Sequence, residues 1–382
     1  MSLVAPPLAL YVHFPWCVRK CPYCDFNSHA AGAELPAEAY VAALARDLEQ
    51  QADAAAGRAI DSVFLGGGTP SLFSPAQIGA VLAHARRTLR FAADAEITLE
   101  ANPGTIERGD FAGYRDAGVN RVSLGAQSFD PGALQRLGRI HAADDTRRAA
   151  AELHAAGLEN FNLDLMYGLP EQSAEAAEAD VVAALALAPA HLSHYQLTLE
   201  PGTLFGARPP PGLPGDETLL DMLQRGQARL ADAGFEHYEV SAYARPSRRC
   251  RHNLNYWHFG DYVGIGAGAH GKLTDAARGQ IVRTARAREP RRYFAEVAAG
   301  GPVAQPVGAA DRPFEFMMNA LRVRAGFERD AFESRTGLAW SAVDALLEKA
   351  RADGLLEHSG HSWRATPLGE RFLNDVLQRF LP

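Results

Sequence analysis

Short apolar runs rich in β-branched residues alternate along the first half of the chain with longer, alanine-rich segments of helical period. The short runs predict strands at residues 8–13, 62–65, 96–100, 121–125, 161–166 and 194–199. The longer segments predict helices at residues 37–51, 75–90, 108–117, 144–156 and 173–187. This alternation is typical of βα units around a parallel sheet. A closed barrel of eight units takes roughly 250 residues. Six units that end near residue 200 therefore favour an α/β fold with an open, partial (β/α)6 barrel.

The regular alternation ends after residue 200. Prolines and glycines at 207–215 mark a linker, and one more helix at 216–233 and a strand at 237–243 follow it. A second break at 298–302 separates this stretch from the C-terminal part of the chain.

The C-terminal part has the pattern of two helices, at 329–336 and 341–353, followed by a hairpin and a last helix. This order predicts a small helical, winged-helix-like domain. The expected domains are 1–205 for the barrel, 206–300 for a linker and a segment that completes the side of the barrel, and 301–382 for the C-terminal domain.

Charge and cysteine content limit the classes of function. A net charge of -7 over 382 residues argues against a protein that mainly coats nucleic acid or anionic lipid. Four cysteines are too few for a disulfide-stapled secreted scaffold. The first residues have no basic region, and no apolar run is long enough to span a bilayer. We therefore expect a cytoplasmic protein whose thiols stay reduced.

Three of the four cysteines lie on one short segment after the first predicted strand. Cys17, Cys21 and Cys24 are spaced closely enough to converge on one metal centre, and thiolates select zinc or iron–sulfur clusters. A structural zinc site needs a fourth ligand, which His13 or Asp25 would have to supply. Three buried structural thiols are a further alternative. In a cubane cluster, three thiolates leave one iron open for a chelating ligand such as S-adenosylmethionine.

The segment Tyr-Val-His-Phe-Pro-Trp-Cys that begins at Tyr11, together with the three cysteines, resembles the radical SAM superfamily. Within it, the segment is similar to the branch that contains oxygen-independent coproporphyrinogen III dehydrogenase and the HemW-type haem chaperones. The resemblance implies that Cys17, Cys21 and Cys24 hold a [4Fe–4S] cluster and that S-adenosylmethionine binds its open iron.

Polar residues and glycines stand at or just past the carboxyl ends of several predicted strands, where barrels of this kind bind ligands. Glycine there lets a ligand approach the backbone, and a carboxylate between leucines needs a partner. These residues are Gly67, Gly68, Thr69, Glu100, Gln127 and Asp164. The resemblance implies that they contact S-adenosylmethionine, with Glu100 at the ribose hydroxyls. It also places Arg139 opposite the methionine carboxylate and Tyr11 beside the pocket.

Two positions bear on the choice between a chaperone and an enzyme. Phe26 stands where the coproporphyrinogen enzyme has a fourth cysteine. The motif His252-Asn-Leu-Asn-Tyr256-Trp257 resembles one in HemW-type proteins whose histidine is associated with haem binding. Imidazole is a good axial ligand for haem iron, although a lone histidine beside aromatic rings is more often a hydrogen-bonded core residue. The resemblance favours a haem chaperone, and the alternative is an oxidative decarboxylase of coproporphyrinogen III.

Two further segments, at 264–271 and 312–382, argue against dinucleotides and nucleic acid as ligands. The glycines at 264–271 do not form a dinucleotide-binding fingerprint, and residues 312–382 carry no basic stripe for nucleic acid. The expected partners are haem, a haem-accepting respiratory protein and a reductant for the cluster, without nucleic acid or an integral membrane segment. A homodimer and peripheral contact with a membrane are compatible with the composition. Cys250 receives no role.

Overall fold

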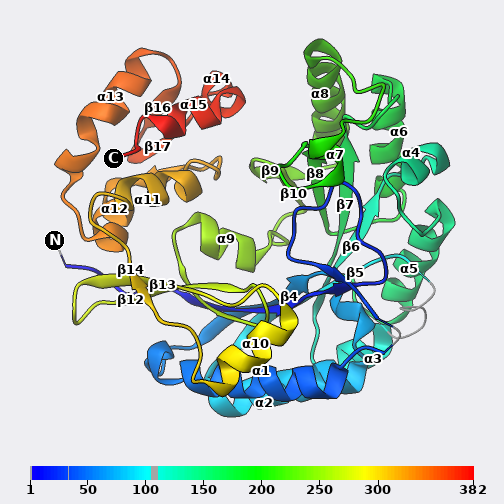
Figure 1. Cartoon of the computed structure of the whole chain (residues 1–382). Helices are drawn as coiled ribbons and strands as arrows, with labels where there is room; N and C mark the ends of the chain where they lie inside the picture. The colour runs from blue at the N-terminus through cyan, green and yellow to red at the C-terminus, as the bar shows by residue number, and fades with distance from the viewer. Residues whose placement is uncertain (1, 33, 105–110) are drawn as a thin grey trace.

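The computed structural model describes residues 2–32, 34–104 and 111–382. Its central feature is a curved sheet of parallel strands that forms an open barrel (Figure 1). The parallel strands, in spatial order, are β11 (Asp261–Ile265), β1 (Leu8–Phe14), β4 (Ile60–Gly67), β5 (Phe91–Ala101), β6 (Arg121–Gln127), β7 (Phe161–Tyr167) and β8 (His191–Gln196). This sheet confirms the predicted α/β fold with a partial barrel.

Antiparallel strands extend both edges of the parallel sheet. They are β10 (Ala242–Ala244) and β9 (Glu236–Glu239) beyond β8, and β12 (His270–Asp275), β13 (Gln280–Ala285) and β14 (Gln305–Pro306) beyond β11. The resulting 12-stranded sheet has β14 at one end and β9 at the other, so the barrel is open within the part of the chain that the structure describes.

Helices cover the convex side of the sheet (Figure 1). These are α1 (Ala37–Gln51), α2 (Pro75–Thr88), α3 (Phe111–Asp116), α5 (Ala143–Ala155), α6 (Ala174–Leu185) and α8 (Asp216–Asp232). Helix α2 illustrates the local signals, because Ser74 caps it by accepting the backbone N–H of Gln77 and Pro75 begins its first turn. Shorter helices are α4 (Pro131–Arg136), α7 (Leu204–Ala207), α9 (Arg251–Trp257) and α10 (Pro290–Ala298), of which α9 packs against β4 and β1 from the concave side.

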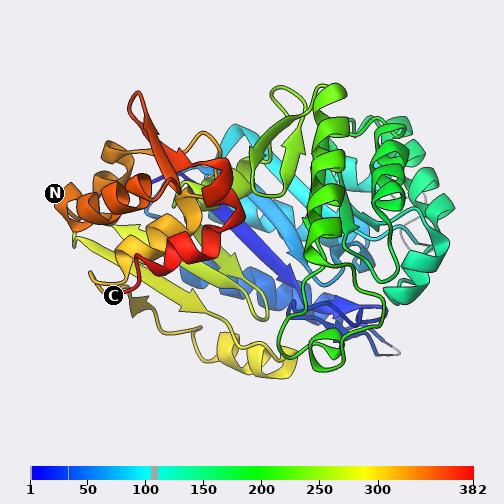
Figure 2. The same ribbon diagram turned by 90° about the horizontal axis from the view of Figure 1, so that it is seen from above.

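The C-terminal part forms a smaller unit beside the barrel, orange to red in Figure 2. It contains α11 (Arg312–Ala320), α12 (Arg329–Thr336), α13 (Asp344–Ala352), α14 (Pro367–Arg371) and α15 (Leu373–Gln378), and a sheet of β15 (Phe327–Glu328), β17 (Ser362–Ala365) and β16 (Leu356–Ser359). Its core includes Phe316, Phe332 and Trp340, and Phe259 and Ile281 from the barrel side join that core. The small helical C-terminal domain is thus confirmed.

Strand β6 shows how the sequence makes the barrel lumen polar. All seven residues of β6 are buried, and side chains on a strand alternate between its two faces. Val122 and Leu124 belong to the hydrophobic core. Arg121 and Ser123, on the opposite face, line a cavity inside the barrel. The same strand therefore serves the core with one face and a polar interior with the other.

Some predicted boundaries differ from the observed ones. The strand expected at 194–199 is β8, which begins three residues earlier at His191, because polar lumen residues interrupt its apolar pattern. Of the helix expected at 108–117, residues 108–110 lie outside the described residues, and the rest forms α3. No helix in the described part of the chain is long and apolar enough to cross a membrane.

Candidate functional site

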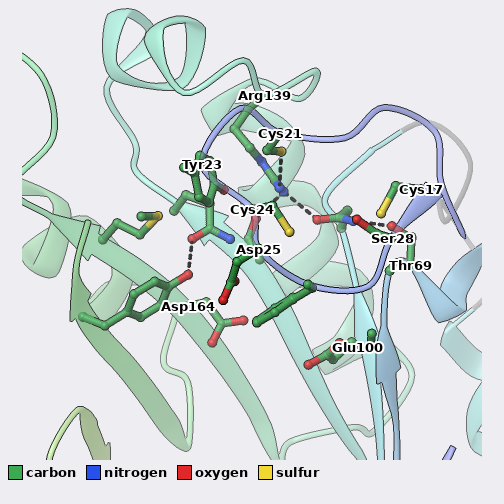
Figure 3. Close-up of a pocket in the computed structure, with 18 of the residues that line it drawn as sticks. Cys17, Cys21, Tyr23, Cys24, Asp25, Ser28, Thr69, Glu100, Arg139 and Asp164 are labelled. Carbon is green, nitrogen blue, oxygen red and sulfur yellow. Dashed lines mark hydrogen bonds between the residues drawn. The ribbon is translucent and has the colours of Figure 1, made fainter. Parts of the chain in front are cut away.

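The cysteine loop, residues 17–28, lies between the short parallel strands β2 (Trp16–Cys17) and β3 (His29–Ala30). Cys17, Cys21 and Cys24 are partly exposed and line one pocket of about 340 Å³. Figure 3 shows the three thiols on this loop, close to the carboxyl ends of the barrel strands. Backbone hydrogen bonds from His29 to the Pro15 carbonyl and from Ala31 to the Cys17 carbonyl, both 2.8 Å, hold the ends of the loop together.

The thiols have a chemistry suited to a soft metal centre. Burial raises the pKa of Cys17 and of Cys24, and hydrogen bonds that include those of Ser28 oppose this shift only in part. Such thiols stay protonated unless a metal or another positive charge holds them as thiolates. Arg139 Nη1 also lies 3.6 Å from Cys21 Sγ, within donating distance. Three sulfur donors beside a fixed cation fit an anionic iron–sulfur cluster.

The zinc alternative fits the geometry less well. His13, one of the two candidate fourth ligands, has both ring nitrogens engaged, Nδ1 with Tyr11 Oη at 3.0 Å and Nε2 with the Asn27 carbonyl at 2.8 Å. Asp25, the other candidate, lines the pocket. Within the described residues, no three Cys, His, Asp or Glu side chains converge closely enough to hold a single metal ion. The donor set therefore favours a polynuclear cluster over one zinc ion.

Packing, as well as any ligand, requires the glycines at the carboxyl end of β4. A Cβ on Gly68 would lie 2.5 Å from the Trp16 carbonyl oxygen, and a Cβ on Gly67 would lie 2.5 Å from the His13 ring. Gly67 also has a φ of 112°, which side chains rarely adopt. Gly67, Gly68 and Thr69 all line the pocket. Gly67 and Gly68 thus allow the end of β4 to pack closely against His13 and Trp16, beside the cysteine loop.

Two carboxyl groups face the pocket from neighbouring parts of the barrel. Glu100 Oε2 accepts the Gly67 N–H at 2.9 Å, and Asp164 accepts bonds from Asn162 at 2.8 Å and Ser123 at 3.2 Å. Burial, with a smaller contribution from the charge of Asp164, raises the pKa of Glu100 to about 7. Burial also raises the pKa of Asp164. Carboxyl groups placed in this way are suited to binding hydroxyl or ammonium groups of a ligand.

Gln127 ends β6 with a φ of 66°, at an irregularity in the pairing with β7. A non-glycine residue in this conformation costs of order 1–3 kcal/mol and persists only where its surroundings hold it. Here its side-chain oxygen accepts a hydrogen bond from Tyr195 Oη at 2.8 Å. The amide is thus fixed at the wall of the pocket.

Arg139 is a pocket residue and not a surface one. Its Nη2 donates to Asn102 Oδ1 at 2.6 Å and to the Gly125 carbonyl at 2.9 Å. Asn102 in turn donates to Thr69 Oγ1 at 2.9 Å. This chain of bonds connects the end of β5 with the cysteine loop.

The sequence-based set missed Asn102 and Tyr195, which also line the pocket. Asn102 follows Glu100 by two residues at a strand end, which was a usable signal. Tyr195 lies inside β8 and also inside the strand predicted at 194–199, but the local pattern does not show which face of that strand meets the pocket.

Tyr11 and His252 do not join the other predicted residues in the main pocket. They line a second chamber of about 260 Å³ inside the barrel, which shares Glu100, Ser123 and Asp164 with the main pocket. His252 is only 1% exposed, and its Nδ1 lies 3.0 Å from Ser62 Oγ. Its Nε2 is buried without a hydrogen-bond partner.

Comparisons with known proteins agree with this site. A model of the radical SAM superfamily matches residues 11–181, and a model of the HemN C-terminal domain matches residues 308–372. Over 376 residues, 98% of each chain, the sequence is 50% identical to the haem chaperone HemW of Escherichia coli. The chain belongs to the HemW family of radical SAM proteins.

Further relatives place the chain within this HemW family. HemW of Haemophilus influenzae is 46% identical over 98% of both chains. The mouse protein named radical S-adenosyl methionine domain-containing protein 1, mitochondrial, is 37% identical over 98% of this chain and 87% of its own. Among solved structures, the coproporphyrinogen III oxidase HemN of Escherichia coli superposes with a TM-score of 0.82 and 24% identity, covering 98% of this chain and 90% of that one. The HemW-family chain and HemN thus share a fold.

Proposed function

We propose that this protein is a haem chaperone that transfers haem to an acceptor protein of the respiratory chain. The observation that supports it most is the 50% identity to a named haem chaperone over almost the whole of both chains. The radical SAM family implies a [4Fe–4S] cluster and S-adenosylmethionine as cofactors. When bound, they can supply reductive cleavage of the sulfonium group.

The pocket residues support this cofactor set. Cys17, Cys21 and Cys24 would hold the cluster, with Arg139 beside Cys21 to offset its negative charge. S-adenosylmethionine would lie along the strand ends, in contact with Gly67, Gly68, Thr69, Glu100, Gln127, Arg139 and Asp164. Tyr11 would contribute only from the second chamber, through the shared wall at Glu100.

His252 is the candidate axial ligand of haem. Burial lowers its pKa to about 3, so the imidazole is neutral and able to coordinate iron. The Nε2 of His252 has no hydrogen-bond partner, and the residue is only 1% exposed. His252 lines a chamber of about 260 Å³, which is too small for a porphyrin. Haem ligation therefore requires α9 to move away from β4, against which it packs.

A haem titration tests the assignment. Anaerobically reconstituted protein should bind haemin stoichiometrically, and His252→Ala should abolish the absorption band of bound haem. His258→Ala is the matched control, because His258 follows the same helix but is exposed and lines neither chamber. Equal binding by His252→Ala and wild type would show that another residue ligates haem. Transfer to a haem-free cytochrome, followed by the same band, tests the chaperone function itself.

The second candidate is oxidative decarboxylation of coproporphyrinogen III, and Phe26 in place of a fourth cysteine argues against it. The likeness to HemN concerns the fold and does not favour this activity. Incubation with coproporphyrinogen III, S-adenosylmethionine and a reductant should leave the substrate unchanged. Formation of protoporphyrinogen would overturn the chaperone proposal.

A further inference from the structure

The second chamber contains a buried arginine that the proposed function does not use. Arg121, the first residue of β6, is 2% exposed and lines the chamber. Its Nε has no hydrogen-bond partner, and none of the described carboxylates forms an ion pair with its guanidinium. A guanidinium stays charged in proteins, and a buried charge without a partner is strongly unfavourable. The chamber thus presents an unpaired cation.

Negative groups act on Arg121 only from a distance. Ser123, which donates to Asp164, is two residues beyond Arg121 on the same strand face. Asp164 therefore lies further along the strand direction than Arg121, toward the main pocket, which it also lines. Glu96, another negative neighbour of Arg121, is occupied with the backbone N–H groups of Arg251 and His252 at 3.2 Å. Arg121 therefore lines the chamber without a directly bonded carboxylate, whereas Glu100 and Asp164 line the end shared with the main pocket.

One part of the chamber wall is aromatic. The Phe64 ring stacks on His252 at 5.1 Å between centroids, and Tyr256 meets His252 edge-on at 5.0 Å. Tyr11 lies 6.4 Å from Phe64 in a stacked arrangement. Like the Nε of Arg121, the Nε2 of His252 is a buried polar atom of a chamber-lining residue that has no hydrogen-bond partner. The rest of the lining is polar and includes Asn162, Ser193 and Asn253. An aromatic wall together with convergent polar groups is typical of small-molecule sites.

The size of the chamber limits its occupant. It measures about 260 Å³, whereas a cavity of about 150 Å³ in another protein holds benzene. One aromatic ring with a carboxylate attached fits this space, and a tetrapyrrole does not.

We propose that this chamber binds a small, flat organic carboxylate, whose carboxylate pairs with Arg121 and whose ring packs against the wall that includes Phe64, Tyr11 and Tyr256. The chamber shares Tyr11, Glu100 and Asp164 with the proposed cofactor contacts, whereas Arg121 lines this chamber and not the main pocket. The proposal does not depend on haem binding. A ligand here would lie against the wall formed by Glu100 and Asp164, next to the position proposed for S-adenosylmethionine.

Calorimetric titration with 4-bromobenzoate, and with neutral 4-bromobenzamide, tests the proposal on the full-length reconstituted protein. The acid should bind at least tenfold more tightly than the amide, because only the acid brings a negative charge to the guanidinium. Arg121→Gln should remove this preference. Arg278→Gln is the control, since the Arg278 side chain is 78% exposed and should leave both affinities unchanged.

A second measurement needs no variant and so does not depend on the folding of Arg121→Gln. Crystals of wild-type protein grown with 4-bromobenzoate should give an anomalous bromine signal inside the chamber, with the carboxylate on Arg121. Absence of binding at millimolar probe, equal affinity for acid and amide, or a bromine site outside the chamber would each overturn the proposal. Weaker haem binding by folded Arg121→Gln would also overturn it, because a haem propionate would then be the partner of Arg121.

Discussion

Replacing Glu100 by glutamine should affect stability and cofactor binding in opposite directions. Glutamine has nearly the same size as glutamate and keeps an oxygen that can accept the Gly67 N–H, which Glu100 accepts at 2.9 Å. The substitution therefore removes a buried negative charge that faces Asp164 without opening a cavity. We expect the ligand-free protein to become more stable at neutral pH and its affinity for S-adenosylmethionine to fall.

The magnitude follows from the raised pKa of Glu100, which moves from 4.5 in the unfolded chain to about 7 in the folded protein. The folded state holds this proton more tightly, so its stabilising effect is complete below pH 4.5 and is lost as pH rises through about 7. Each pKa unit corresponds to about 1.4 kcal/mol, which gives about 3 kcal/mol above pH 7 as the largest effect. Solvent in the pocket screens the charge, so Glu100→Gln should gain about 1–3 kcal/mol at pH 8.

Urea unfolding of the cluster-free chain, followed by circular dichroism under reducing conditions, measures this gain. The advantage of Glu100→Gln should be small at pH 5 and should grow up to pH 8. Glu217→Gln, at an exposed position on α8, should show no such trend. A variant that is less stable than wild type at pH 8 would refute the reasoning from buried charge.

Binding of labelled S-adenosylmethionine to the reconstituted protein at pH 8 measures the other effect. Loss of hydrogen bonds to a charged carboxylate should weaken binding by about 1.5–3 kcal/mol, or roughly 10- to 150-fold. Unchanged affinity, together with raised stability, would show that Glu100 does not contact the cofactor.

Three further substitutions test the loop and the core. Cys21→Ala should lose most of the iron and sulfide retained after reconstitution, and full retention would contradict its assignment as a ligand. Gly68→Ala places a Cβ about 2.5 Å from the Trp16 carbonyl oxygen. It should therefore lower both cluster content and thermal stability, and a variant with normal values for both would show that the loop shifts freely. Asp47→Asn leaves the fully buried Arg286 without its charged partner. It should reduce the free energy of unfolding by about 3–5 kcal/mol in urea titrations, and a loss under 1 kcal/mol would show that the pair is not needed.

The fold was predictable where local patterns decide it. Strands β1, β4 and β7 have continuous apolar faces, and the expected runs at 8–13, 62–65 and 161–166 lie inside them. Strand β11 was not predicted, because its pairing joins Leu8 to Asp261 across more than half of the chain. Local periodicity contains no information on such a partner. The glycines around 264 could be excluded as a dinucleotide motif, but their place beside β1 could not be deduced.

The pocket residues could be predicted where the type of residue indicates its use. They were harder to predict where the direction of the side chain decides whether it lines the pocket. The thiols and carboxyl groups were found because cysteine and buried carboxylate have few structural uses. The glycines at the carboxyl end of β4 were predicted from the close approach of a ligand. That reason is incomplete, because packing against Trp16 already requires Gly68. The sequence identified Arg121 only as the first residue of the strand predicted at 121–125. Only the folded barrel shows that Arg121 lines the lumen.

Phe26 shows why cluster chemistry alone cannot distinguish the two candidate functions. Its side chain is 59% exposed and lines the main pocket, two residues beyond Cys24. Three thiols already line the pocket without it, so the position is not needed to complete the set of cluster ligands. A change from cysteine to phenylalanine there alters the apolar surface that a large, flat ligand would meet at the pocket. Iron content and S-adenosylmethionine affinity should therefore be alike in a chaperone and an enzyme of this fold. The fate of the tetrapyrrole, retained intact or decarboxylated, is the observation that separates them.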